Sequence, residues 1–134
     1  MVRYADIVTF TCLKGFAFND RGESKDAHDL VYCLEHGEGG VDAALAAFRD
    51  ALTGPHRESI VEALKLLRAR CCTDDNAEGF EKDGPVKFAL FEDDGDGDRD
   101  RRILRQRRAA TVVDSLVQPL LHEIEESTKS GKAG

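Results

Sequence analysis

Apolar residues recur along much of this chain at the three- and four-residue steps that line one face of an amphipathic helix. The stripes before residue 73 predict four helices, over residues 4–18, 24–36, 41–52 and 55–70. In the second of these, Ser24 has the hydroxyl of a good N-cap, and Gly37 is expected to supply a left-handed exit. The first half of the chain therefore predicts helices joined by short turns.

The pattern changes after the acidic break at residues 73–78. A glycine-proline pair is followed there by a run of valine, phenylalanine and leucine with one lysine. Because these residue types favour extended structure, we expect a strand or an extended loop at residues 85–91. A long helical pattern resumes near Arg99, and Pro119 is expected to kink or divide that last helix.

The predicted fold class is mainly α, a single-domain bundle of about five helices with one short extended segment. We expect the helical domain to cover residues 1–126 and residues 127–134 to form a flexible tail. With 134 residues, of which 41% are hydrophobic and 34% charged, the chain can bury one shared core. No apolar run approaches the roughly 20 residues that cross a bilayer, and the N-terminus lacks a signal-peptide layout, so a cytoplasmic location is expected.

The cysteines are spaced unlike the ligands of a zinc knuckle or the frame of a secreted disulfide-rich domain. They are Cys12, Cys33, Cys71 and Cys72. Ligand pairs usually stand two to four residues apart, which the adjacent Cys71 and Cys72 do not. We therefore expect reduced thiols, no metal site and no cofactor. His28 and His36 show no metal-binding spacing either and are interpreted as surface histidines.

The charges are segregated along the chain, although the net charge is −7. Six arginines lie within residues 99–108, whereas acids gather at residues 74–78 and 92–100. An evenly spread negative charge would repel a phosphate backbone, so binding to nucleic acid would need the local basic stretch. Segregated charge also suits a surface that binds a protein partner.

Arg101, Arg105 and Arg108 form one stripe on the last helix, spaced to follow the phosphates of a nucleic acid. In the alternative interpretation they pair with Asp98, Asp100 and the acidic loop before them, or lie on a solvated face. The net charge favours this alternative, as does the lack of interleaved aromatic residues that would stack on bases.

The acidic loop also matches part of a calcium-binding loop. Glu92, Asp94, Asp96 and Gly97 occupy the first, third, fifth and sixth places of an EF-hand. The twelfth place, which needs a bidentate glutamate, is Ile103. We therefore interpret the loop as a solvated turn whose acids favour the dipole of the following helix.

Three charged residues are predicted to converge if the first two helices form a hairpin. Lys14 lies on the apolar stripe of the first helix, where an ammonium must reach water or meet an acid. Asp26 and Asp29 are three residues apart and so are neighbours on the second helix. The cluster predicts a salt-bridge network that fixes the hairpin, a pocket for a ligand or partner, or simple surface charge. Ion-pair networks outnumber active sites among such clusters, which favours the first interpretation.

The same residues resemble a known family. A Lys-Gly at Lys14, then an Arg-Gly turn, then Lys-Asp-Ala-His-Asp-Leu from Lys25 to Leu30 is similar to the C-terminal half of the AbiEii-type nucleotidyltransferases, toxins of toxin–antitoxin and phage-resistance systems. The resemblance extends loosely to about residue 125, but its specific part covers about twenty residues. It implies that Lys14, Lys25 and Asp26 or Asp29 belong to a binding site.

The resemblance stops short of the family's catalytic head, whose paired acids hold Mg²⁺ and which is expected before Met1. Without such carboxylates, nucleotidyl transfer loses its main electrostatic stabiliser, so we expect no catalysis by this chain alone. The predicted function is a non-catalytic protein-binding module in phage defence, in a toxin–antitoxin pair, or in counter-defence as an anti-CRISPR-like inhibitor. The alternative is part of a split or minimal nucleotidyltransferase that acts on tRNA or nucleotide with Mg²⁺. The oligomeric state and the partner stay open.

Overall fold

The computed structural model describes residues 4–74, 77–92 and 98–132, and over these ranges the chain is an all-α bundle without a strand. The prediction of a mainly α, single-domain fold is confirmed. The elements in chain order are α1 (Tyr4–Arg21), α2 (Ser24–His36), α3 (Gly40–Ala51), α4 (Arg57–Cys71), a 3₁₀ turn η1 (Gly79–Glu81), α5 (Asp83–Glu92) and α6 (Arg99–Lys132).

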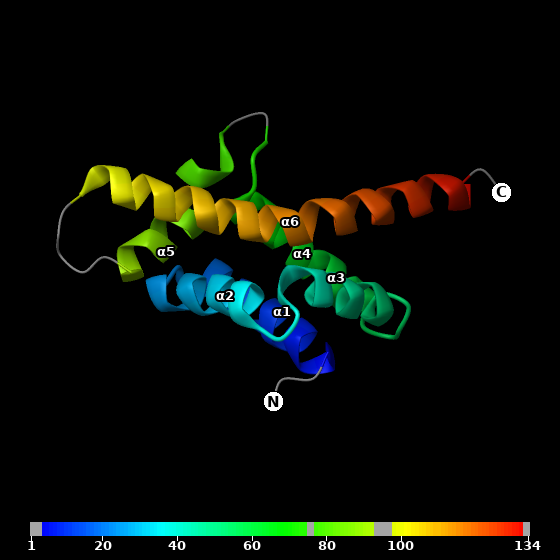
Figure 1. The fold of residues 1–134 in the computed structure, drawn as a ribbon. Helices are drawn as coiled ribbons and strands as arrows, with labels where there is room; N and C mark the ends of the chain where they lie inside the picture. Colours follow the sequence, from blue (N-terminus) through cyan, green and yellow to red (C-terminus); the bar gives the residue numbers. More distant parts are fainter. Residues whose placement is uncertain (1–3, 75–76, 93–97, 133–134) are drawn as a thin grey trace.

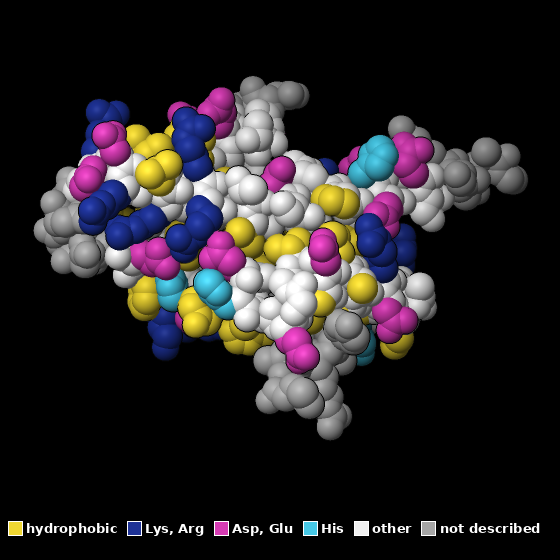
Figure 2. Space-filling view, in the orientation of Figure 1, with side chains coloured by type: hydrophobic (Ala, Val, Ile, Leu, Met, Phe, Trp, Pro, Cys, Tyr) yellow, Lys and Arg dark blue, Asp and Glu magenta, His cyan; other side chains and the backbone are white. Residues whose placement is uncertain are grey.

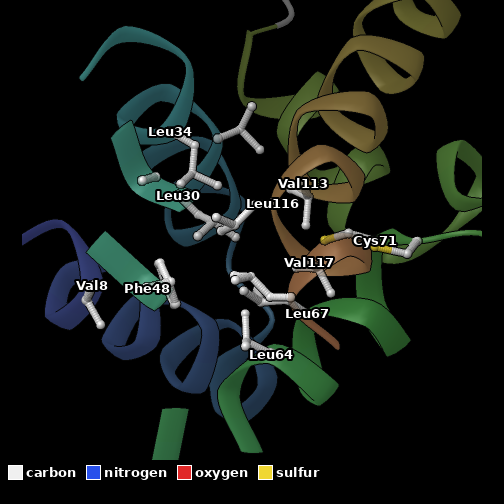
Figure 3. Close-up of a cluster of buried hydrophobic side chains, with 14 of the residues drawn as sticks. Val8, Leu30, Leu34, Phe48, Leu64, Leu67, Cys71, Val113, Leu116 and Val117 are labelled. Atoms are coloured by element: carbon white, nitrogen blue, oxygen red, sulfur yellow. The ribbon is translucent and has the colours of Figure 1, made fainter. Parts of the chain in front are cut away.

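One hydrophobic core joins all six helices. Its buried side chains recur at helical spacing, for example Leu64 and Leu67 on α4 and Val113 and Val117 on α6. Figure 3 shows these side chains pointing toward one another, with Phe48 of α3 among them. The apolar stripes that predict the helices are therefore also the residues that hold them together.

The long helix α6 lies across the other helices, and its C-terminal turns extend past α3 and α4 (Figure 1). Pro119 lies inside this helix and does not divide it, so of the two predicted effects, a kink or a division, the division is wrong. The helix also continues to Lys132, so the part of the predicted tail that the structure describes, residues 127–132, is helical. A proline in mid-helix costs one backbone hydrogen bond, and here the flanking residues Val117, Leu120 and Leu121 are buried in the core.

The prediction of an extended segment at residues 85–91 is wrong, because those residues belong to helix α5. Pro85, Phe88 and Ala89 stand at the first, fourth and fifth positions of a helical stripe, and all three are buried. Burial of this stripe against α2 and α6 outweighs the preference of valine and phenylalanine for strands. The proline sits in the first turn of α5, where its missing N–H costs nothing.

Two predictions about helix ends are also wrong. Helix α2 begins at Ser24, but the cap residue is Glu23 and no side chain bonds to the free amides of the first turn. Gly37 leaves α2 in an extended conformation, with φ −64° and ψ 157°. The left-handed conformation falls instead on Gly39 and Gly40, with φ of 80° and 62°, which turn the chain into α3. The sequence identifies the glycines of this turn, but which of them adopts a positive φ depends on how the next helix packs.

Candidate functional site

The three charged residues predicted to converge do so at the hairpin between α1 and α2. The Lys14 Nζ donates hydrogen bonds to Asp29 Oδ2 at 2.9 Å and to Asp26 Oδ1 at 3.3 Å. A fourth member was missed: Arg21, at the end of α1, donates to both carboxylate oxygens of Asp26, at 2.8 and 3.1 Å. Gly22, with φ 65°, makes the turn that brings the two helices together. We call these four charged residues the hairpin cluster.

The hairpin cluster is electrically balanced, because two cations face two carboxylates. Asp26 is 2% exposed, and both of its oxygens accept from a cation, as a buried carboxylate requires. The hydrogen bond to Asp29 raises the pKa of Lys14, with a further contribution from Asp26 and against the opposing effect of desolvation. The ammonium also lies 5.6 Å from the centre of the Phe10 ring. This arrangement is that of a satisfied ion-pair network.

Lys25 is the one residue implied by the family resemblance that does not join the hairpin cluster. It is exposed on α2 and makes no ion pair with any residue that the structure describes. Its neighbour Asp26 belongs to the hairpin cluster although Lys25 does not, so the motif alone does not decide which side chains meet.

The arginine stripe is paired with acids. Arg105 lies 3.9 Å from Glu92, and Arg108 lies 3.3 Å from both Glu92 and Glu35. Arg101 lies 3.7 Å from Asp98. The predicted pairing with Asp98 and with the acidic loop is present, the latter through Glu92, and Glu35 of α2 is a further partner that was not foreseen. Contact of these arginines with nucleic acid stays a prediction. Residues 93–97, the middle of the predicted calcium-like loop, lie outside the described residues.

His28 is not the surface histidine that the sequence predicts. Its ring stacks on buried Phe88 with centroids 5.5 Å apart, and it also contacts the rings of Phe91 at 4.6 Å and Tyr32 at 5.7 Å. The side chain is 19% exposed, whereas that of His36 is 54% exposed. The spacing of His28, Tyr32 and His36 at four-residue steps is a sequence signal that could have revealed the α2 half of this cluster.

The same histidine connects the two charged clusters. His28 Nδ1 lies 3.9 Å from Asp29, a member of the hairpin cluster, and Nε2 lies 3.4 Å from Glu92, which pairs with Arg105 and Arg108. His28 thus lies between the hairpin cluster on α1 and α2 and the acid–arginine pairs on α5 and α6. The two candidate sites from the sequence are therefore neighbours, and we call their charged residues together with His28 the charged network.

An exposed group of rings and aliphatic side chains lies beside this network. We define the aromatic patch as His28, Tyr32, Leu90 and Phe91. Tyr32 is 54% exposed, and Leu90 and Phe91 are each 47% exposed, unusually open for residues of this size. Figure 2 shows hydrophobic and histidine side chains side by side over α2 and the end of α5, with basic and acidic side chains along the α6 side.

The described residues show neither a metal-binding group nor a membrane-spanning helix. No three His, Cys, Asp or Glu side chains among them gather as metal ligands would. None of the described helices is both long and apolar enough to cross a bilayer. The four cysteines are free thiols. Burial raises the pKa of Cys12 to about 11 and that of Cys72 to about 12, and the pKa values of Cys33 and Cys71 are raised as well.

Comparison with protein families, curated proteins and solved structures finds no match to this chain. The resemblance to the AbiEii-type nucleotidyltransferases thus stays a prediction that rests on residues 13–34. The proposed function therefore rests on the geometry of the site.

Proposed function

We propose that this protein is a non-catalytic protein-binding module and that the aromatic patch is its binding surface. The observation that carries the proposal is the exposure of Tyr32 on α2 and of Phe91 on α5, whose rings both contact the ring of His28, with Leu90 exposed beside Phe91 in the sequence. Aromatic residues are enriched at the centres of protein interfaces because they bury much apolar area at little cost in side-chain entropy. Here they stand on two packed helices, which hold them in place before binding.

The hairpin cluster supports this surface from behind. Its ion pairs fix α2 against α1, and His28 passes from that cluster into the aromatic patch. We infer that Lys14, Asp26 and Asp29 position the patch and do not themselves contact a partner. The mutual pairing of the cations and carboxylates in the hairpin cluster supports this structural interpretation of the three charges over a ligand pocket.

The biological setting follows from the resemblance alone and is part of the proposal. A transferase head encoded elsewhere, a cognate antitoxin or a component of a phage-defence machine would each be a suitable partner. The net charge of −7 also suits an anti-CRISPR-like inhibitor, which would occupy a basic nucleic-acid channel with acidic surface outside the aromatic patch.

The experiment is affinity capture from host lysate with the wild type and a Tyr32→Ser/Phe91→Ser variant, followed by mass spectrometry of protein and nucleic acid. Leu13→Ser is the matched control, because Leu13 is 62% exposed on α1, a helix that contributes nothing to the patch. We expect a protein partner that the control retains and the patch variant loses by about tenfold or more, as for two hot-spot residues.

Two outcomes would count against the proposal. A protein retained equally by the patch variant would place the interface elsewhere on the molecule. Recovery of tRNA or nucleotide alone, lost on Lys14→Ala or Asp29→Ala, would instead support a split nucleotidyltransferase that uses the hairpin cluster and Mg²⁺.

A further inference from the structure

Three acids that border the aromatic patch, among the residues that the structure describes, are neutralised within the protein. Asp29 accepts from Lys14, Glu92 pairs with Arg105 and Arg108, and Glu35 pairs with Arg108 as well. A carboxylate already held by a cation offers little net attraction to an incoming positive charge, since its field is largely cancelled. These three carboxylates therefore offer little attraction to a cationic group of a partner.

Two lysines near the aromatic patch are not paired in this way with any described acid. Lys25 stands three residues before His28 and seven before Tyr32, on the same exposed stripe of α2. Lys87 stands three residues before Leu90 and four before Phe91 on α5. Among the residues that the structure describes, neither lysine has an ion-pair partner. Each half of the aromatic patch thus has an uncompensated ammonium one turn away.

We propose that the aromatic patch docks an acidic segment of a partner protein, one that carries aromatic or aliphatic anchors between its carboxylates. The inference rests on the proposed function and names the chemistry of the partner. Anchors would bury against Tyr32 and Phe91, while carboxylates would pair with Lys25 and Lys87 at the rim. Rim charges of this kind select the partner and speed its association more than they tighten the complex.

A second copy of this chain fits the same surface less well. Most homodimers are twofold symmetric, so a residue of one patch faces a different residue of the other copy's patch. Lys25 and Lys87 would then need acids of the other copy. The acids beside the patch, Asp29, Glu35 and Glu92, are already paired with cations of their own chain. The local basic rim thus points to an acidic partner, although the protein as a whole carries a net charge of −7.

The test is selection of a phage-displayed library of random peptides on immobilised wild-type protein, with counter-selection on Tyr32→Ser/Phe91→Ser. Enriched peptides are then synthesised, and their binding to single variants is measured by fluorescence anisotropy. Lys25→Glu and Lys87→Glu are compared with Lys65→Glu, which makes the same charge change at an exposed lysine of α4. Circular dichroism confirms that each variant is folded.

We expect the enriched peptides to carry a net negative charge and at least one aromatic or leucine residue. Their affinity should fall about three- to tenfold in Lys25→Glu and in Lys87→Glu, should be nearly unchanged in Lys65→Glu, and should weaken with salt.

The outcomes separate this inference from the proposed function. Neutral or basic peptides that need Tyr32 and Phe91 but ignore Lys25 and Lys87 would overturn the acidic partner and leave the binding surface intact. A library that yields no peptide preferring the wild type over Tyr32→Ser/Phe91→Ser would overturn both. A dimer in sedimentation equilibrium that Tyr32→Ser/Phe91→Ser dissolves would place a second copy on the patch and overturn the acidic partner alone.

Discussion

Asp26 shows at the scale of one residue how this protein keeps a charge inside. The carboxylate is almost fully buried, yet both oxygens accept hydrogen bonds from cations, Oδ1 from Lys14 and Arg21 and Oδ2 from Arg21. Those cations reach it from a side that is open to water, since the Arg21 side chain is 53% exposed. Asp29 also pairs with Lys14, but its side chain is 28% exposed. Water can therefore replace part of the interaction if that ion pair is removed.

This difference predicts unequal effects of two isosteric substitutions. Asp26→Asn removes the buried negative charge and leaves Lys14 and Arg21 facing each other, so we expect a loss of about 2–4 kcal/mol in the free energy of unfolding. Asp29→Asn should cost about 1 kcal/mol or less, as for a partly exposed pair. Urea unfolding monitored by circular dichroism measures both. If Asp26→Asn unfolds at the urea concentration of the wild type, the structural role given to the hairpin cluster is wrong.

The convergence of Lys14, Asp26 and Asp29 could be predicted because it depends on local facts only. Helical spacing sets the faces, and a glycine turn closes the hairpin. The surroundings of His28 could not be predicted in the same way, because Phe88 and Phe91 lie about sixty residues farther along the chain. No local pattern shows which helix will pack on which, so the aromatic patch emerges only from the fold.

Helix α5 makes the same point at the scale of an element. Its residue types favour a strand, but its spacing is helical, and the two signals conflict over only ten residues. In so short a segment, tertiary burial decides, and α5 buries Phe88 and Ala89 against its neighbours. The longer helices carry enough repeats of their stripe for spacing alone to identify them.

The docking of α5 onto α4 depends on the absence of a side chain at Gly84. A Cβ there would lie 2.9 Å from the carbonyl oxygen of Arg70 and against the sulfur of Cys71. A backbone carbonyl in the last turn of a helix cannot move aside without breaking its own contacts. The close approach of the two helices therefore requires glycine at this position.

We accordingly expect Gly84→Ala to lower the free energy of unfolding by about 1–3 kcal/mol, the usual cost of overpacking. Gly54→Ala is the control, because Gly54 is exposed in a turn and its added Cβ would lie 3.3 Å from its nearest neighbour, the Ala51 oxygen. Thermal unfolding of both variants decides the matter. Equal melting temperatures for Gly84→Ala and Gly54→Ala would show that α5 can shift away from α4 at no cost.

For the whole molecule, the predictable part of the fold is the set of helices and the less predictable part is their arrangement. The mainly α class follows from stripes that recur along the chain, and the single core collects those stripes. The path of α6 across the bundle does not follow from its own sequence, and neither does its continuity through Pro119. Both depend on partners distant in the chain, which a pattern of apolar positions does not name.

Burial of the thiols gives the whole molecule a pH dependence whose sign can be worked out. A cysteine has an ordinary pKa of 9.0, and burial raises the pKa of Cys72 to about 12 and that of Cys71 as well. Above pH 9 the unfolded chain releases these protons, while the folded protein keeps them. The unfolded state then binds fewer protons, so stability is fully present below pH 9 and is lost as the pH rises above it.

Each thiol that ionises only in the unfolded chain removes about 1.4 kcal/mol per pH unit, so Cys71 and Cys72 together should remove about 3 kcal/mol per unit. Urea unfolding between pH 8 and pH 10, under reducing conditions, measures the summed slope of the buried thiols, to which Cys12 and Cys33 add because burial raises their pKa values as well. Cys72→Ala should flatten the slope by about one thiol's share, whatever its effect at pH 8. Lys14 also loses its proton at high pH, but its raised pKa places that loss above 10.5 and in both proteins alike. Identical slopes for Cys72→Ala and the wild type would mean that Cys72 ionises as readily inside the protein as in the unfolded chain, and that α4 opens to water at its C-terminal end.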